Sequence, residues 1–456
     1  MPFNDSIVVE TQLVTPPPPP PDTARTWAVV AAASPAGYST KRYSTIGEMN
    51  DDGWTNAQSA YVAMAKLFAQ TPTDTALGGI IVIKRATAVA EIWAIDINST
   101  TDGNHTISIG GVLAATFAAS ANTATEIKDG LIAAFDAGPF GSAIDAASID
   151  TDSLSLTGLE AGIPFLPTVA VPGGTIHDVT QTQASVGVYQ DLDAAHALFK
   201  FRNVLMPAAS DPELDEGDRW TGADRTTRRC FLFAENNDAG VYDSGDTDNL
   251  AVKWLTASRE RVNLLSHPNS TEHMAFAVAG RIGASYPGAR AWHYLPLAGS
   301  LESAITANRT SNQTATMKAR RMSWTERYDG PTSKLLLISV GPNVPSGVFV
   351  FQRWAEDQLW YIARALCDSA MSANPGVNLD DAGLRTLVDT ISPALLEMVT
   401  EGVLAADYTV SYVPLDQVPA GELAIGDYKT TGAIVINATV TPKLRALRVT
   451  AYLAVV

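Results

Sequence analysis

The order of apolar and polar positions predicts alternating strands and helices over most of the chain. Residues 26–33 and 79–84 are nearly continuous apolar runs, which is typical of strands covered on both faces. Between them, residues 55–70 place apolar side chains at helical spacing, from Ala57 to Phe68. A strand, a helix and a second strand in succession form the start of an α/β layer.

The same alternation returns in the second half of the chain. The predicted strands there are residues 230–234 and 335–340, and the predicted helices are residues 249–265, 351–370 and 381–403. Pro393 is expected to kink or split the last helix, because proline lacks the amide hydrogen that a helix needs.

Composition changes near residue 93, where the chain becomes rich in Ala, Ser, Thr, Asp and Gly. Within this stretch we predict a hairpin around Gly110-Gly111, a helix over residues 123–135 and a strand over residues 154–156. A compositional break with its own strands and helix indicates a small α/β module inserted into the surrounding fold.

Apolar alternation reappears at both ends of the chain, in residues 6–14 and again in residues 433–440 and 447–455. These positions are the candidate inter-subunit strand residues: Ile7, Val9, Leu13, Ile434, Ile436, Val440, Leu447, Val449 and Leu453. A strand at each terminus is a liability unless another strand pairs with it.

Six consecutive prolines, Pro16–Pro21, follow the first of these strands. Such a run adopts polyproline II and forms a stiff spacer of roughly 19 Å. Three interpretations stay open: a disordered tail, a ligand for an SH3-like module, or an arm that pairs with a neighbouring subunit.

We therefore predict a mixed α/β fold with several domains: a central α/β core, an inserted small α/β module and extended β arms at both ends. The predicted division is an N-terminal arm with its polyproline spacer (1–25), the first part of the core (26–92), the inserted surface module (93–178), the second part of the core (179–432) and a C-terminal β arm (433–456).

Charge and length narrow the possible partners. The chain has 456 residues, with 31 Lys and Arg against 48 Asp and Glu, for a net charge of −17. Nucleic-acid backbones and anionic membrane faces attract cationic surfaces, so neither is an expected partner. No apolar run approaches the ~20 residues that span a bilayer, and no signal peptide is evident, so we expect synthesis and assembly in a reducing cytoplasm.

Motifs that carry chemistry are missing from the sequence. No glycine precedes a lysine, so there is no P-loop, and no Gly-x-Gly or HExxH motif occurs. Cys230 and Cys367 lie 137 positions apart, and His267 and His273 do not share a helix face. We accordingly predict a protein that is not an enzyme, with no catalytic, cofactor-binding or metal-binding residue.

Two short basic clusters stand out in this acidic chain: Arg225, Arg228 and Arg229, and Lys318, Arg320 and Arg321. They are candidates for contacts with acidic loops of neighbouring subunits, such as residues 211–218 or 238–248. The alternative is that both clusters are solvated surface charges, since exposed ion pairs contribute little.

Four stretches resemble the tail sheath proteins of contractile-tailed bacteriophages. They are residues 56–72 with the strand that ends at Lys84-Arg85; residues 262–268, leading to 279–288 and Leu297-Ala-Gly299; the Trp-rich helix from Arg353 with the helix from Asp381-Ala-Gly383; and the C-terminal strand pair. The likeness covers most of the chain, and the six prolines depart from it.

The resemblance implies a structural subunit of a virion tail, assembled in the bacterial host cytoplasm. Family members form stacked six-fold rings around a tail tube protein, with baseplate and tail terminator proteins as further partners. Terminal segments add strands to sheets of adjacent subunits, and contraction drives the tube through the host envelope without nucleotide hydrolysis. Two rival hypotheses are a receptor-binding fibre or adhesin and an undetected hydrolase.

Overall fold

The structure is a computed structural model of the 456-residue chain. It describes residues 26–70, 79–120, 122–174, 177–207, 209–223, 229–236, 238–269, 272–283, 295–298, 305, 309–328, 334–338, 343–359, 361, 381–400, 403, 409–412, 434–440 and 449–455. The candidate N-terminal strand and its prolines therefore lie outside the described residues.

A nine-stranded sheet forms the centre of the molecule, with the strand order β14-β16-β15-β13-β12-β11-β1-β3-β2. Its strands are β1 (Trp27–Ala31), β2 (Lys41–Tyr43), β3 (Ile80–Lys84), β11 (Asn203–Met206), β12 (Phe231–Glu235), β13 (Val262–Ser266), β14 (Leu295–Pro296), β15 (Ser323–Tyr328) and β16 (Lys334–Ile338). The six strands from β15 to β3 run parallel, and antiparallel strands flank them on both sides.

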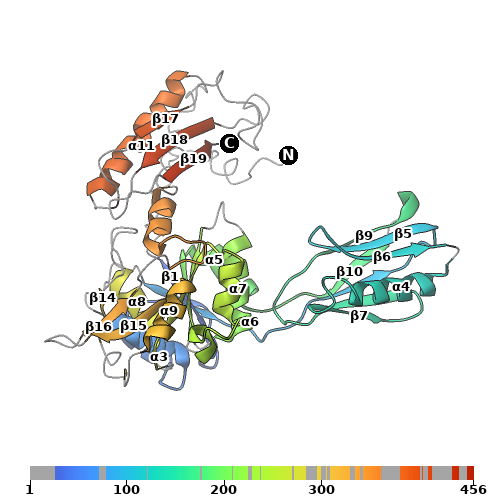
Figure 1. Ribbon diagram of the computed structural model, residues 1–456, viewed down its shortest axis with the longest axis horizontal. Coiled ribbons are helices and arrows are strands. Elements are labelled where there is room, and N and C mark those ends of the chain that lie inside the picture. The colour runs from blue at the N-terminus through green and yellow to red at the C-terminus, as the bar shows by residue number, and fades with distance from the viewer. Residues whose placement is uncertain are drawn as a thin grey trace.

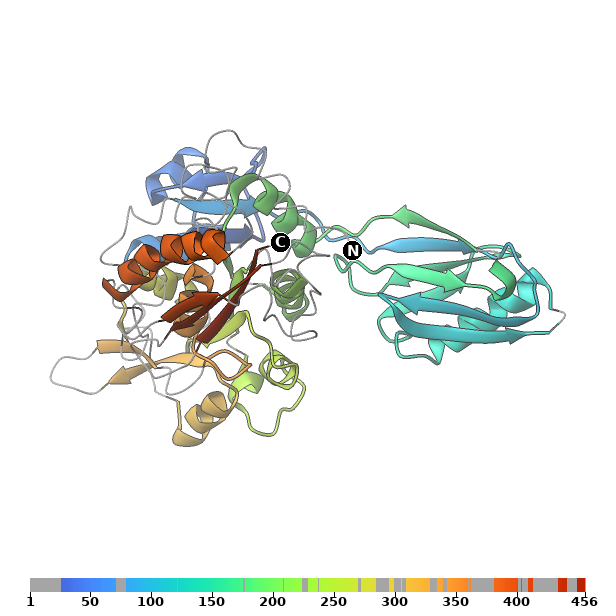
Figure 2. The ribbon, with the colours of Figure 1, turned by 90° about the horizontal axis from the view of Figure 1, so that it is seen from above.

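Helices cover both faces of this sheet, as the views along and across it show (Figures 1 and 2). They are α2 (Ile46–Asp51), α3 (Ser59–Phe68), α5 (Val188–Phe199), α6 (Asp211–Ala223), the 3-10 turn η4 (Ala239–Tyr242), α7 (Leu250–Thr256), α8 (Met274–Ile282) and α9 (Ser311–Ala319). Residues 350–359 are also helical. The predicted mixed α/β fold is thus confirmed.

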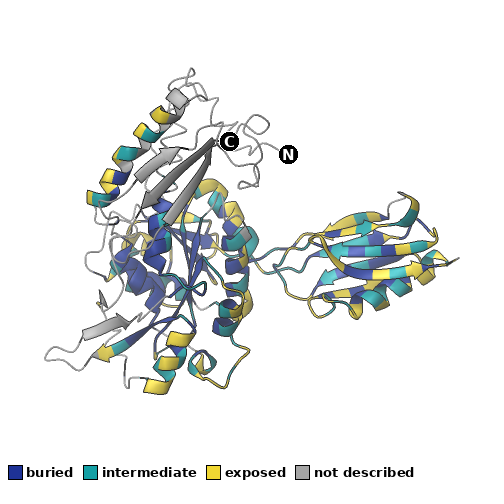
Figure 3. Cartoon of the chain, turned by 45° about the horizontal axis from the view of Figure 1, so that its top comes forward, coloured by how far each residue is buried: buried dark blue, intermediate teal, exposed yellow. Residues whose placement is uncertain are grey.

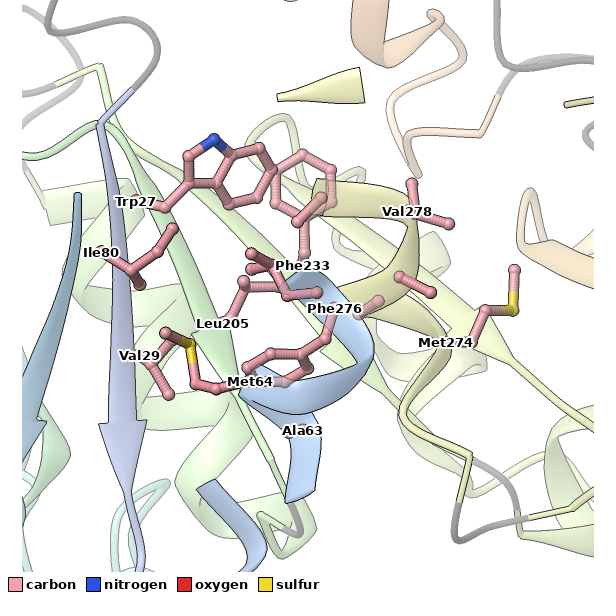
Figure 4. Packing of buried hydrophobic residues seen from close by; sticks show 14 of the residues in the cluster. Trp27, Val29, Ala63, Met64, Ile80, Leu205, Phe233, Met274, Phe276 and Val278 are labelled. Atoms are coloured by element: carbon pink, nitrogen blue, oxygen red, sulfur yellow. The ribbon is translucent and has the colours of Figure 1, made fainter. Parts of the chain in front are cut away.

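The parallel strands bury both of their faces, which explains their continuous apolar runs (Figure 3). On one face Trp27, Val29 and Phe233 pack against α3, α8 and the helix at residues 350–359 (Figure 4). On the other face Val30 and Leu232, among others, pack against α5, α6 and α7. Each large apolar side chain buried in this way contributes about 1.5–3 kcal/mol.

The predicted helix over residues 249–265 is wrong in its second half. Asn249 caps the start of α7 by accepting a hydrogen bond from the Val252 amide, and the helix ends at Thr256. Ser258 then takes a left-handed conformation (φ 48°), which ends helical geometry, and the chain enters β13. Every residue of β13 is buried, so its apolar run alone could not distinguish a strand from a helix.

Residues 92–183 form a separate module that projects to one side of the core (Figure 1). Its elements are β4 (Ile92–Asp96), β5 (Gly103–Ile109), β6 (Val112–Ala119), α4 (Ala124–Asp136), β7 (Ile144–Ser148), β8 (Ser153–Gly158), β9 (Pro167–Ala170), the 3-10 turn η3 (Pro172–Gly174) and β10 (Asp178–Gln183). The strands form two antiparallel sheets, ordered β10-β4-β8-β7 and β6-β5-β9. Ile127, Leu131 and Phe135 of α4 share one core with both sheets.

Local signals inside the module act as the sequence predicts. Gly110 and Gly111 both have positive φ (57° and 84°), the geometry of a two-residue hairpin turn between β5 and β6. Thr123 begins α4 with a capping box, because its side chain accepts from the Glu126 amide while the Glu126 carboxylate accepts from the Thr123 amide. The last strand, β10, extends to Gln183, five residues beyond the boundary expected from composition.

Two chain segments, residues 85–91 and 184–187, join the module to the core. They pair with each other through an antiparallel bridge, in which Val89 and Val186 exchange backbone hydrogen bonds of 2.7 and 3.1 Å. The Gly162 amide donates to the Val89 carbonyl at 3.0 Å, so the loop between β8 and β9 contacts the same connection. We call this connection between the module and the core the joint.

The bridge gives a specific route to removing the module. Joining Val89 to Val186 through Asn-Gly should close a hairpin at the joint and leave the core folded, because the bridged backbones already lie opposite each other. Cooperative thermal unfolding and near-ultraviolet circular dichroism measure the result. A control that joins Ala90 to Val179 retains part of β10 without its partner β4 and should be less stable. A first variant without cooperative unfolding would show that the core needs the module.

We expect a buried histidine pair, His105 and His177, to make the module sensitive to acid. His105 Nε2 donates to the Thr101 carbonyl at 2.8 Å, so its Nδ1 accepts from His177 Nε2 at 3.0 Å. Burial, and then the neighbouring His105, lowers the pKa of His177 to about 4. A histidine whose pKa falls on folding contributes stability above its unfolded pKa of ~6.5, and that stability is lost as the pH falls towards 4.

We expect the module to lose up to about 3 kcal/mol between pH 6.5 and pH 4. Hydrogen exchange of peptides from β5 and β6 should therefore accelerate over this range. His177→Gln should flatten the response, whereas His196→Gln in the core domain should leave it unchanged. An equally steep response in His177→Gln would contradict this assignment.

Candidate functional site

The C-terminal part of the chain forms a small unit of its own, above the core in Figure 1. It consists of α11 (Asp381–Thr400) and a three-stranded antiparallel sheet of β17 (Thr409–Tyr412), β18 (Ile434–Val440) and β19 (Val449–Val455). The helix continues through Pro393 as one element, although we expected a kink or a break there. Leu395 and Met398 of α11 are fully buried, and α11 lies beside β17.

The register of this sheet places the predicted strand residues on one face. Ile434 lies opposite Val455, Ile436 opposite Leu453 and Val440 opposite Val449, and directly opposed residues share a face. β17 continues this face, since Tyr412 lies opposite Ile436. The apolar residues that alternate along these strands therefore lie at positions on one continuous face of the sheet.

β18 and β19 pair with each other along their full length, so neither is a lone arm in this structure. The strand order β17-β18-β19 leaves β17 and β19 at the two edges. Among the described residues, no fourth strand pairs with either edge. Edge strands present unpaired backbone N–H and C=O groups, which are suited to pairing with a strand of another chain. Leu447, Ile7, Val9 and Leu13 lie outside the described residues.

The first basic cluster meets a buried carboxylate. Arg225 and Arg228 lie outside the described residues, but Arg229 places Nη1 3.3 Å from Oδ1 of Asp357. Arg261 Nη1 pairs with the other carboxylate oxygen of Asp357, and both partners are nearly inaccessible to solvent. Burial lowers the pKa of the Arg229 guanidinium, and Asp357 offsets part of that effect. Arg229 is thus committed to an ion pair inside its own subunit.

Three arginines lie at the same end of the parallel sheet. Arg202 and Arg261 directly precede β11 and β13, and Arg229 lies two residues before β12, the strand between them. The Arg202 guanidinium stacks 3.6 Å from the centre of the Tyr361 ring, and burial lowers its pKa to about 10. Asp357 belongs to the helix at residues 350–359, so this cluster attaches that helix to the amino ends of the parallel strands.

The second basic cluster also has partners within the subunit. Arg320 is buried and donates to the carbonyl oxygens of Gly240, Asp243 and Asp246, at 2.5, 2.7 and 2.5 Å. It therefore closes the acidic loop 238–248 of its own chain. Arg321 donates to the Pro345 carbonyl. Lys318 is exposed and stays a candidate for contact with a neighbour.

The acidic segment 211–218 is predicted above to be a loop. That prediction is wrong, because the segment is the first part of helix α6. Glu213 pairs with Arg85, and Asp218 pairs with Arg259 at 2.8 Å. Glu216 is buried and accepts from the Tyr189 amide at 3.3 Å, and burial raises the pKa of its carboxyl group. These carboxylates hold the core together and are not an exposed acidic surface.

Glu216 also fixes the module joint. A Cβ atom added to Gly162 would lie 2.6 Å from Oε1 of Glu216, and one added to Gly187 would lie 2.6 Å from Oε2. Gly162 also has a φ of 92°, a conformation that side chains disfavour. Sequence reasoning missed Glu216 and Asp357, because each meets its partners only after distant segments pack together.

The described residues contain no group of three or more His, Cys, Asp or Glu side chains that could hold a metal ion. In the same part of the chain, no helix combines the length and the apolar character needed to cross a bilayer.

The chain matches no model of a known protein family and no curated protein. Among solved structures, it is similar to a sheath tail protein from Desulfitobacterium hafniense, with 12% identity, a TM-score of 0.47 and coverage of 94% of this chain and 96% of that one. It is also similar to the baseplate structure of the anti-feeding prophage, which was symmetrised six-fold (13% identity, TM-score 0.39, coverage 59% and 71%). A third similar structure is the helical sheath of the anti-feeding prophage in its contracted state (14%, TM-score 0.38, 58% and 72%).

The Asp357 cluster generates a stability prediction. Asp357→Ala leaves the buried Arg261 and the partly buried Arg229 without this carboxylate, and should cost about 3–5 kcal/mol in the free energy of unfolding. The matched control is Asp248→Ala, which removes an exposed partner of Lys253 and should cost no more than about 1 kcal/mol. Urea unfolding measures both values, and equal small losses would contradict the assigned role of Asp357.

Proposed function

We propose that this chain is the structural subunit of a contractile tail sheath, which polymerises around a tail tube and contracts to drive it through a host envelope. The four stretches of sequence that resemble phage tail sheath proteins support this proposal. They include residues 56–72, which contain helix α3, and residues 262–268, which contain strand β13. Rings of six subunits, a tail tube protein, and baseplate and terminator proteins as partners belong to the same proposal.

The observation that carries the proposal is the strand order of the C-terminal sheet, which leaves two edge strands. β17 and β19 form its edges, and within the described residues neither has a partner on its outer side. A subunit that adds a strand to such an edge gains backbone hydrogen bonds without a large rigid interface. Subunits linked in this way can rotate relative to one another, since the linking segments absorb the movement.

The proposed donor is the N-terminal strand of a neighbouring subunit, with Ile7, Val9 and Leu13 on its apolar face. The proline run after it is a stiff rod of roughly 19 Å, which would hold the strand away from its own core. The free energy for contraction would then lie in the difference between two lattices of the same subunits. A nucleotide site is not needed in such a mechanism.

The test is assembly by the purified full-length chain, seen by negative-stain microscopy. Wild type should form ribbed tubes. Removing residues 1–22 deletes the donor strand but no described element, so that variant should stay folded and fail to form tubes. A control lacking residues 1–5 retains the strand and should assemble normally.

Removing residues 434–456 deletes β18 and β19 and should abolish tubes as well, because it removes the sheet that accepts the strand. Tubes formed by the chain without residues 1–22 would disprove strand donation and leave the sheath proposal standing. Wild type that forms rods or discrete particles under all conditions would instead count against a sheath.

A further inference from the structure

A pocket of about 330 Å³ lies between the module and the core. The hairpin turn at Ile109-Gly110, the segment before β7 and the loop between β8 and β9 line it, and Arg219 of α6 completes it from the core side. Its volume is within the range of small-molecule sites, and Phe140, Ile163 and Phe165 make its lining mostly apolar.

Exposed apolar residues lie in the segments that line this pocket. Val112, Leu159 and Leu166 have 57%, 57% and 58% of their surface exposed, and they are three of only seven large hydrophobic residues so exposed among the described residues. Leu166 lines the pocket, Val112 lies opposite the lining residue Ile109 in the β5–β6 hairpin, and Leu159 lies between the lining residues Gly158 and Glu160. Leu166 therefore adds exposed apolar surface to the lining of the pocket, as is typical of a binding site.

The walls of the pocket are held in place. Leu166 accepts a hydrogen bond from the Gly110 amide at 3.0 Å, which ties the loop between β8 and β9 to the hairpin turn. Glu91 accepts from the Phe165 amide, and Trp93 Nε1 donates to the Phe165 carbonyl at 3.1 Å. Glu216, one helical turn before Arg219, packs against Gly162 of the same loop. The pocket is therefore preformed.

Two charged side chains, Arg219 and Glu160, mark its opening, since both line the pocket and both are exposed. Neither forms an ion pair with any residue that the structure describes. A guanidinium carries a permanent charge and a fixed fork of donors that fits carboxylate or sulfonate oxygens. Arg219 also stands on a helix, whereas Glu160 belongs to a loop.

We propose that this pocket binds an amphipathic monoanion, with the apolar body against Phe140, Ile163 and Phe165 and the anionic group on Arg219. The ligand would contact the module with its body and the core with its anionic group. Its binding would therefore restrain the module relative to the core. Nothing in this inference depends on the chain being a sheath subunit.

Removing the charge of Arg219 and removing the charge of Glu160 are expected to change the affinity for an anion in opposite directions. The probe is 8-anilinonaphthalene-1-sulfonate, titrated into the dilute full-length chain and followed by its fluorescence. Arg219→Gln should weaken binding about tenfold, because it removes the partner of the anion. Glu160→Gln should tighten binding about twofold, because it removes a like charge from the opening. Lys318→Gln, which changes a distant exposed charge, is the control for net charge and should have no effect.

A steric variant locates the probe. Ala143 is exposed and lines the pocket, so Ala143→Trp should occupy it and abolish binding. Ala147→Trp adds the same side chain at an exposed position of β7 that does not line the pocket, and it should bind normally. Competition by decanoate, decanol and decylammonium then reports the preferred head group, with decanoate expected to compete best.

Equal affinity of wild type, Arg219→Gln and Glu160→Gln would overturn the proposal. So would preferential competition by decylammonium, since it would assign the opening to Glu160 and a cation. Retention of binding in Ala143→Trp would place the probe on another apolar surface, and it would also contradict the assignment.

Discussion

Burial of both faces of the parallel strands is the constraint on which the rest of this molecule depends. Trp27, Val29 and Phe233 face one helical layer, while Val30 and Leu232 face the other. Trp27, Phe233 and Trp354 form a cluster with ring centres 5.1–5.9 Å apart. Because both faces are covered, every other unit of the chain must attach at an edge or an end of this sheet.

The polar groups that make those attachments lie at the ends of the strands. Arg229 and Arg261 precede two adjacent strands and meet Asp357 from the helix at residues 350–359. At the carboxyl end of β3, Arg85 pairs with Glu213 of α6, and the chain then leaves for the module. Charges are tolerated in these partly buried positions because each has an opposite charge or backbone groups as partners.

The module and the C-terminal unit are attached in different ways. The module leaves and returns through two bridged segments, with Glu216 packed against Gly162 and Gly187. Its two sheets share one hydrophobic core with α4. Within the described residues, the C-terminal unit is a three-stranded sheet with β17 and β19 at its edges, beside the helix α11. The apolar pocket beside Arg219 lies where the module meets the core, and the proposed strand addition involves the C-terminal unit.

The sequence by itself determined the features that depend on neighbours along the chain. The buried strands β1 and β3, the Gly110-Gly111 turn, the capping box at Thr123 and the alternation in β18 follow from local rules of spacing and backbone geometry. Contacts between residues that are far apart in the sequence were decided only by the tertiary structure. Arg261 and Asp357 are 96 positions apart, and Arg320 meets a loop 74–80 positions away, so no local pattern indicates either contact. The same limit explains the misassigned strand β13: an apolar run is compatible with a strand or a helix until its neighbours β12 and β15 pair with it.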